Sequence, residues 1–250
     1  EHYWVMTAYF MMYLFVPFLS QGVKRLTKKQ FQTVLVLLLT LVFIIKSVVP
    51  VKLPTDRQGY DCIWYMCVFL VAAYIRLYGI PFFKNIWRSL LAYFGAGAGI
   101  FALAFVLRFL YLRTGRLRDM LSVSYNYNHI LTLLAAVALF YVFYHMRIKQ
   151  GVFSCFVCRI APYTLGVYLW HEHEAIRYEW QNWFYFVAAK PDNGVMLVPY
   201  TLLAALLVFA VGIVLDVLRS LLFRVLHLLF SHVGVYRRLC QWLDTLVIKA

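Results

Sequence analysis

A short run of ionisable residues, His171, Glu172, His173 and Glu174, carries the side chains in this sequence that are best suited to proton transfer. A histidine can take a proton from a hydroxyl group, and a neighbouring carboxylate can orient the imidazole for that step. His171 and Glu172 are therefore the candidate catalytic residues. The alternative is that the run only forms hydrogen bonds where a helix ends at a membrane interface.

The residues that could bind a metal ion do not form a site by their spacing. Two positions along a helix turn the side chain by about 200°, so His171 and His173 would point to opposite sides of a continuous helix. Cys155 and Cys158 are spaced as in some zinc and redox sites, but zinc needs two more ligands and a redox pair needs a soluble, thioredoxin-like setting. We therefore expect no metal.

Two arginines, Arg76 and Arg108, lie at the ends of apolar segments. A guanidinium group that faces the protein interior could hold a phosphate or a developing oxyanion, so both residues are candidates for cofactor binding. The alternative is that their long side chains only reach out to water. Asp216 lies in another apolar segment, three residues before Arg219, and this spacing predicts an internal ion pair.

The segments that carry these groups are strongly apolar. Hydrophobic residues make up 64% of the 250 positions and the mean hydropathy is +0.75, which is well above the values of soluble domains. About 20 apolar residues form a helix that crosses about 30 Å of hydrocarbon. We therefore predict one all-α domain over residues 1–250, a polytopic bundle of about seven transmembrane helices at 3–19, 31–49, 60–78, 89–112, 129–144, 155–170 and 195–218.

Small residues in the fourth apolar segment predict close helix packing. Gly95, Gly97 and Gly99 alternate with alanines there, and such a pattern lets a neighbouring helix approach the backbone. We interpret this pattern as a packing signal and not as a nucleotide-binding loop.

The charge distribution predicts an orientation in the membrane. If the first segment enters from outside and the helices alternate, most of the 24 Lys and Arg residues fall on the inner side, as the positive-inside rule requires. The amphipathic, basic tail after the last segment is then cytoplasmic. The net charge of +14 is explained by this orientation, so we expect no nucleic-acid partner.

The chain opens with Glu1 and His2 and enters an apolar segment at once, without the charged region and cleavage site of a signal peptide. We therefore expect it to be an internal piece of a longer polypeptide whose amino-terminal helices are missing.

Short motifs of aromatic and small residues occur one after another along the whole chain. Its motifs are Tyr3-Trp4, Thr7-Ala8-Tyr9, Pro17-Phe18-Leu19, Leu26-Thr27-Lys28-Lys29-Gln30, Gly59-Tyr60, Ala73-Tyr74-Ile75-Arg76-Leu77-Tyr78, Tyr125-Asn126-Tyr127-Asn128 and Leu165-Gly166-Val167-Tyr168-Leu169-Trp170-His171-Glu172. In this order the motifs resemble the acyltransferase 3 family of bacterial membrane O-acyltransferases.

The resemblance implies a bundle of about ten helices, of which this chain would be the last seven. It implies that an acyl group, acetyl first of all, moves from acyl coenzyme A to a hydroxyl group of a cell-surface glycan or similar acceptor at the bacterial inner membrane. The family's main reactive histidine would lie upstream of Glu1. We therefore expect this portion to be inactive alone, with His171 and Glu172 contributing from the outer side.

Two other classes of function use the same kind of sequence. A transporter or flippase also combines small-residue helix contacts with sparse intramembrane charge, although transporters often show internal repeats and paired broken helices, and this sequence has neither. A membrane scaffold without catalytic activity is the third class.

Overall fold

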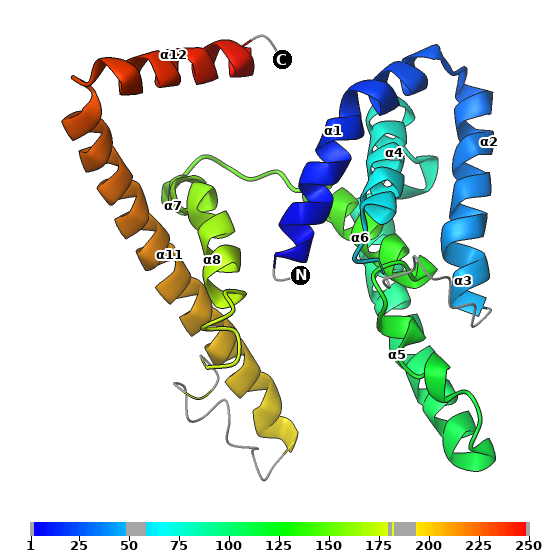
Figure 1. The fold of residues 1–250 in the computed structure, drawn as a ribbon. Coiled ribbons are helices and arrows are strands. Elements are labelled where there is room, and N and C mark those ends of the chain that lie inside the picture. Colours follow the sequence, from blue (N-terminus) through cyan, green and yellow to red (C-terminus); the bar gives the residue numbers. More distant parts are fainter. Residues whose placement is uncertain (1–2, 49–58, 180–181, 183–193, 249–250) are drawn as a thin grey trace. The chain divides into compact units, whose positions relative to one another are not determined.

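The computed structural model describes residues 3–48, 59–179, 182 and 194–248. The chain divides into two compact units, one over Tyr3–Ile148 and the other over Lys149–Ala250, and each is described by itself (Figure 1). The prediction of one domain over residues 1–250 stays a prediction.

The first unit consists of helices joined by short turns. These helices are α1 (Trp4–Arg25), α2 (Lys28–Leu39), a π-helical turn (Thr40–Ile44), α3 (Ile45–Val48), α4 (Cys62–Tyr78), α5 (Ile86–Thr114) and α6 (Ile130–His145). Short 3₁₀ turns cover Pro81–Phe83, Arg118–Met120 and Val123–Tyr125. Helices α5 and α6 lie side by side, and α1 and α2 both contact α4.

The second unit contains α7 (Val152–Ile160), the 3₁₀ turn Ala161–Tyr163, α8 (Thr164–His171), the 3₁₀ turn Gly194–Met196, α11 (Leu197–Phe230) and α12 (Gly234–Ile248). Helix α8 lies along α11 (Figure 1). Among the residues that the structure describes there is no strand, so the predicted all-helical class is confirmed.

Within the described residues, five helical stretches are long and apolar enough to cross a membrane: Val5–Arg25, Ile86–Thr114, Arg118–His145, Val152–His171 and Gly194–Phe230. Cys62–Tyr78 is a shorter apolar helix. The other predicted segment, at 31–49, is helical from Lys28 to Val48 in three consecutive pieces. The protein is therefore a multi-pass membrane protein. That the two shorter segments also cross the membrane, which would give a total of about seven spans, stays a prediction.

Large apolar side chains on the outside of the helices fit a lipid environment. Phe18 is 76% exposed, Phe105 is 73% exposed and Leu206 is 66% exposed. In water each of these side chains would lose the favourable free energy of burial, about 1.5–3 kcal/mol, whereas lipid chains can cover them without that loss.

Capping residues explain where several helices begin and end. Thr27 and Gln30 form a reciprocal capping box at the start of α2, and the side chains of Asp61 and Asn85 accept backbone hydrogen bonds at the starts of α4 and α5. Gly79 ends α4 with a φ of 64°, a conformation that glycine adopts without a steric penalty. The sequence therefore sets these helix ends locally.

The core of the first unit is built from aromatic residues at helix crossings. Phe31 and Phe43 are fully buried; Phe31 packs against Tyr74, and Phe43 packs against Trp64 with ring centroids 4.6 Å apart. Phe83 stacks on Tyr141 at 4.9 Å. These contacts hold α2, the π-helical turn and the connection after α4 against their neighbours.

The predicted close packing at the alternating glycines is correct at one position only. A Cβ added at Gly99 would lie 3.2 Å from Leu131 on α6, whereas one at Gly95 or Gly97 would meet nothing within 4 Å in the described part of the chain. Closer approaches occur at Gly212, where a Cβ would lie 2.8 Å from the Val167 backbone, and at Gly166, which faces Asp216. A small residue therefore permits a close helix contact only where a second helix lies against it.

Candidate active site

Helix α8 ends at His171, which places the candidate catalytic residues at a turn. Glu172 is the residue that caps the helix, and its backbone N–H still bonds to the carbonyl of Tyr168 at 3.2 Å. The chain then turns tightly, with the Arg177 N–H donating to the carbonyl of His173 at 2.7 Å. Since no continuous helix follows His171, the predicted opposite placement of the two histidines on one helix does not apply.

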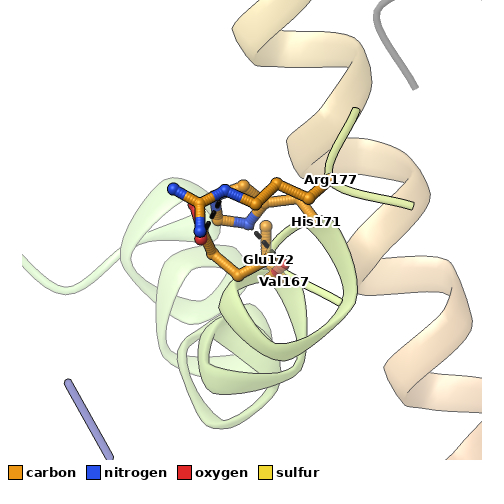
Figure 2. Close-up of polar contacts among 4 residues, drawn as sticks. All are labelled: Val167, His171, Glu172 and Arg177. Carbon is orange, nitrogen blue, oxygen red and sulfur yellow. Dashed lines mark hydrogen bonds and ion pairs between the residues drawn. The ribbon is translucent and has the colours of Figure 1, made fainter. Parts of the chain in front are cut away.

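His171 has a defined hydrogen-bonding arrangement (Figure 2). Its Nδ1 lies 2.8 Å from the carbonyl oxygen of Val167, one helical turn earlier. A carbonyl can only accept, so Nδ1 carries the proton and Nε2 of the neutral ring has a free lone pair. A histidine held in this tautomer can accept a proton at Nε2.

Glu172 lies beside the atom of His171 that would accept that proton. Its Oε1 is 3.5 Å from His171 Nε2, and its Oε2 is 3.4 Å from Nε of Arg177 (Figure 2). The side chains of His171, Glu172 and Arg177 are 30%, 21% and 40% exposed, so the group is partly accessible, although Oε2 of Glu172 itself is buried. The carboxylate is placed to stabilise an imidazolium ion, while Arg177 balances its charge.

Arg177 was not among the candidate residues from the sequence. It lies five positions after Glu172, a spacing that does not bring two side chains together on a helix, and only the turn after α8 joins them. The position of a basic residue shortly after an acidic run was the only sequence signal for this contact.

A cavity of about 800 Å³ lies in the first unit and includes Arg76 in its lining. Its walls are mainly apolar, with Val68, Val71, Leu133, Val137 and Phe140 among them, and Lys84 and His145 also contribute to the lining. Arg76 lies in the last turn of α4, Lys84 follows the next 3₁₀ turn, and His145 ends α6. The groups that can carry positive charge thus come from the ends of neighbouring elements.

Two long-range hydrogen bonds set the shape of this cavity. The Ile80 N–H donates to the hydroxyl of Tyr141 at 2.8 Å, and His145 Nε2 bonds to the carbonyl of Phe83 at 2.7 Å. These bonds attach the turn after α4 to the last turns of α6. They place Lys84 and Arg76 on the same cavity as His145.

Comparison with known protein families gives one match. The family model of the acyltransferase 3 family, described as an acyltransferase domain, covers residues 1–217 of the chain. This chain belongs to the acyltransferase 3 family. No curated protein and no solved structure shows a significant match to it. Both the run that begins at His171 and the cavity with Arg76 lie inside the matched region.

The second candidate arginine of this acyltransferase-family chain lies elsewhere. Arg108 lines a cavity of about 250 Å³ with Ala104, Tyr111, Leu121 and Tyr125, and not the cavity that contains Arg76. The structure therefore does not bring the two candidate cofactor-binding arginines to one site. Their roles in cofactor binding stay predictions. Arg76 is favoured as the anion-binding residue because Lys84 and His145 line the same cavity.

The predicted ion pair of Asp216 is present. Arg219 Nε lies 2.6 Å from Oδ1 of Asp216 and its Nη2 lies 3.3 Å from Oδ2. Asp216 is only 6% exposed and packs against Gly166 of α8. This carboxylate supports the contact between α8 and α11.

The cysteines and histidines do not gather into a metal site in the described residues. No group of three or more possible ligands lies close enough there to hold an ion. Cys155 and Cys158 are free and exposed. The expectation of a metal-free protein stays a prediction.

His145 is a further residue that sequence reasoning missed. His145 ends an apolar helix, a position where a histidine commonly lies at the membrane interface. Only the structure shows that it lines the cavity and bonds to the carbonyl of Phe83. A polar ring in the last turn of an otherwise apolar helix was the available signal.

Proposed function

We propose that this acyltransferase 3 protein moves an acyl group from acyl coenzyme A to a hydroxyl group of a cell-surface glycan or a similar acceptor. Membership in the family supports acyl transfer as the type of reaction. The observation that carries the choice of donor is the apolar cavity that Arg76, Lys84 and His145 line.

The cavity suits a donor that is apolar at one end and anionic at the other. Its volume of about 800 Å³ falls within the usual range for ligand sites, roughly 300–1,000 Å³. Apolar walls would receive the acyl chain, while Arg76 and Lys84 would pair with the phosphates of coenzyme A. The His145 ring adds a further polar group beside these cations.

The acceptor hydroxyl needs a group that takes its proton. His171 presents Nε2 for this step, and Glu172 at 3.5 Å would stabilise the imidazolium ion that forms. In the overall reaction the acceptor oxygen replaces sulfur on the acyl carbonyl carbon: a carbon–oxygen bond forms, the carbon–sulfur bond of the thioester breaks, and the proton of the hydroxyl group ends on the thiol of coenzyme A. Products are an ester and free coenzyme A, so no oxidant or metal is required.

We propose acetyl as the acyl group and the cell membrane as the site, with a cytoplasmic carboxy terminus. The excess of basic residues in alternate connections supports this orientation. Arg76 and Lys84 belong to a connection that this orientation places inside, where acyl coenzyme A is made. The cavity also has room for longer acyl groups, so the chain length is tested by a series of donors.

The direct test supplies labelled acyl coenzyme A to membranes that contain the full-length protein. We expect label from the acetyl donor to enter the glycan fraction faster than label from octanoyl or palmitoyl donors. If no donor transfers label while an intact solute crosses sealed vesicles, the protein is a transporter and the proposal is wrong.

A matched pair of substitutions tests the donor cavity. Arg76→Gln removes one cation from the large cavity. We expect the KM for acyl coenzyme A to rise about tenfold, because the variant loses one charge-assisted hydrogen bond and a factor of ten corresponds to about 1.4 kcal/mol. Arg108→Gln is the control, because it changes an arginine that lines the other cavity. Equal KM values for both variants and the wild type would show that Arg76 does not bind the donor.

A further inference from the structure

The end of α11 and the whole of α12 lie beyond the family match, which stops at residue 217. Helix α11 has 34 residues and is therefore about 51 Å long. A bilayer is about 40–45 Å thick including both headgroup layers, and membrane helices are commonly tilted by about 20° or more. The end of α11 near Phe230 thus reaches a headgroup layer, and α12 begins there.

The turn between the two helices is held by side chains. Helix α12 leaves the end of α11 in a new direction (Figure 1). The hydroxyl of Tyr236 on α12 lies 3.0 Å from Nδ1 of His227 on α11, and the Tyr236 ring also packs against Phe230. These contacts fix the direction in which α12 starts, so α12 does not simply prolong the spanning helix.

Helix α12 is amphipathic in sequence. At 100° per residue, its apolar residues at positions 235, 239, 242, 243 and 246 share one side, and Arg237, Arg238 and Gln241 fall on the other. In the structure Val235 is 79% exposed and Trp242 is 57% exposed. A valine and a tryptophan on one exposed side form an apolar surface that water would not favour.

The charges near this surface identify what covers it. Residues 219–250 contain one acidic residue, Asp244, and five Lys and Arg residues, Arg219, Arg224, Arg237, Arg238 and Lys249. A helix that has one apolar side, arginines on the other side and a tryptophan near the boundary lies in the interface of a membrane and prefers anionic lipids. The connection to a spanning helix keeps α12 at that interface.

We propose that α12 lies in the plane of the headgroup layer and binds anionic phospholipid. Its apolar side enters the outer part of the acyl chains, and Arg237 and Arg238 pair with lipid phosphates. The His227–Tyr236 contact aims the helix along the surface. This role is independent of acyl transfer and needs no residue of the proposed catalytic site.

The test measures the depth of α12 in the intact protein. Single cysteines replace Val235, Trp242 or Gln241 in a background where the five native cysteines are serine, and each is labelled with a nitroxide. The protein is placed in nanodiscs of phosphatidylcholine, with or without about a quarter of phosphatidylglycerol. Collision with oxygen reports lipid contact, and collision with a water-soluble nickel chelate reports exposure to water.

We expect the labels at 235 and 242 to collide with oxygen and the label at 241 to collide with nickel, with greater depth when phosphatidylglycerol is present. The Arg237→Glu and Arg238→Glu double variant should lose the response to phosphatidylglycerol, whereas the double lysine variant should keep it. Equal nickel access at all three sites would show a helix in water. Spin–spin broadening with no response to lipid charge would show a second copy of the chain as the partner, and either result would overturn the proposal.

Discussion

Two carboxylates in the second unit pair with arginines in different ways. Asp216 is almost fully buried and pairs with Arg219, three residues away on the same helix, through one short bond of 2.6 Å and a second of 3.3 Å. Glu172 is 21% exposed, lies at the end of α8, and contacts His171 and Arg177 at the longer distances of 3.5 and 3.4 Å. The first pair belongs to a packed helix contact, and the second group lies on a turn that other molecules can reach.

The difference separates a structural ion pair from a candidate for chemistry. A buried carboxylate that is paired with an arginine stabilises one arrangement, and its burial limits access by a substrate. Catalytic contacts in an unliganded site are often longer and tighten when substrate binds. From this contrast we expect substitutions around Asp216 to change stability and substitutions around Glu172 to change turnover.

The largest effect should come from Gly166→Val. A side chain at position 166 would occupy the space of the Asp216 carboxylate, so α8 and α11 could not keep their contact. Overpacking of this kind costs about 1–3 kcal/mol or more, and here we expect little folded protein to survive. The measurement is the monodisperse fraction in fluorescence-detected size exclusion.

Gly97→Val is the control for that experiment, because a Cβ at position 97 meets nothing within 4 Å in the described residues. A normal yield for the Gly166 variant would mean that the close approach of α8 and α11 is not required.

The next largest effect should follow His171→Gln. The substitution removes the imidazole that would accept the proton, and general base catalysis contributes about 10²–10⁴ in rate. We therefore expect turnover in membranes to fall at least about a hundredfold while the melting temperature stays near that of the wild type.

His173→Gln is matched to it in residue type and lies two positions away in the same turn. Were both variants equally slow, the turn as a whole would matter and not the proton acceptor at position 171.

A smaller effect is expected for Arg219→Ala. It leaves the buried Asp216 carboxylate without its counterion, and an unpaired buried charge is strongly destabilising. The melting temperature in detergent should fall by several degrees, without a change in the KM for the acyl donor.

The smallest effect is expected for Asp216→Asn. This change leaves a charge only on Arg219, whose side chain is 59% exposed and can be hydrated. Its melting temperature should therefore fall less than that of Arg219→Ala. A larger fall for Asp216→Asn would mean that the carboxylate makes a contact more important than the arginine pair.

Parts of the fold could be predicted because they depend on local sequence. The capping box at Thr27 and the glycine end of α4 at Gly79 are determined by a few adjacent residues. The Asp216–Arg219 pair also depends only on helical spacing. By contrast, only Gly99 of the three alternating glycines meets a neighbouring helix in the described residues, because the same small residues are equally compatible with an uncovered surface.

The candidate site divides in the same way. His171 and Glu172 are adjacent in sequence and could be selected from their chemistry, although their roles stay predictions. Arg177 joins them only because α8 stops at His171 and the chain turns back. His145 and Lys84 could not be linked with Arg76 from the sequence, since the residues whose bonds hold α6 to the turn are 61 and 62 positions apart.

By itself the sequence determined that this protein is a helical membrane protein, because hydropathy and segment length are properties of each stretch of chain and need no partner. The ordered motifs along the same sequence placed it in the acyltransferase 3 family. Only the tertiary structure decided which cations line one cavity, which glycines meet a neighbouring helix and how Arg177 reaches Glu172. These contacts depend on how distant segments pack, and inside a membrane many apolar surfaces are nearly equivalent until specific side chains meet.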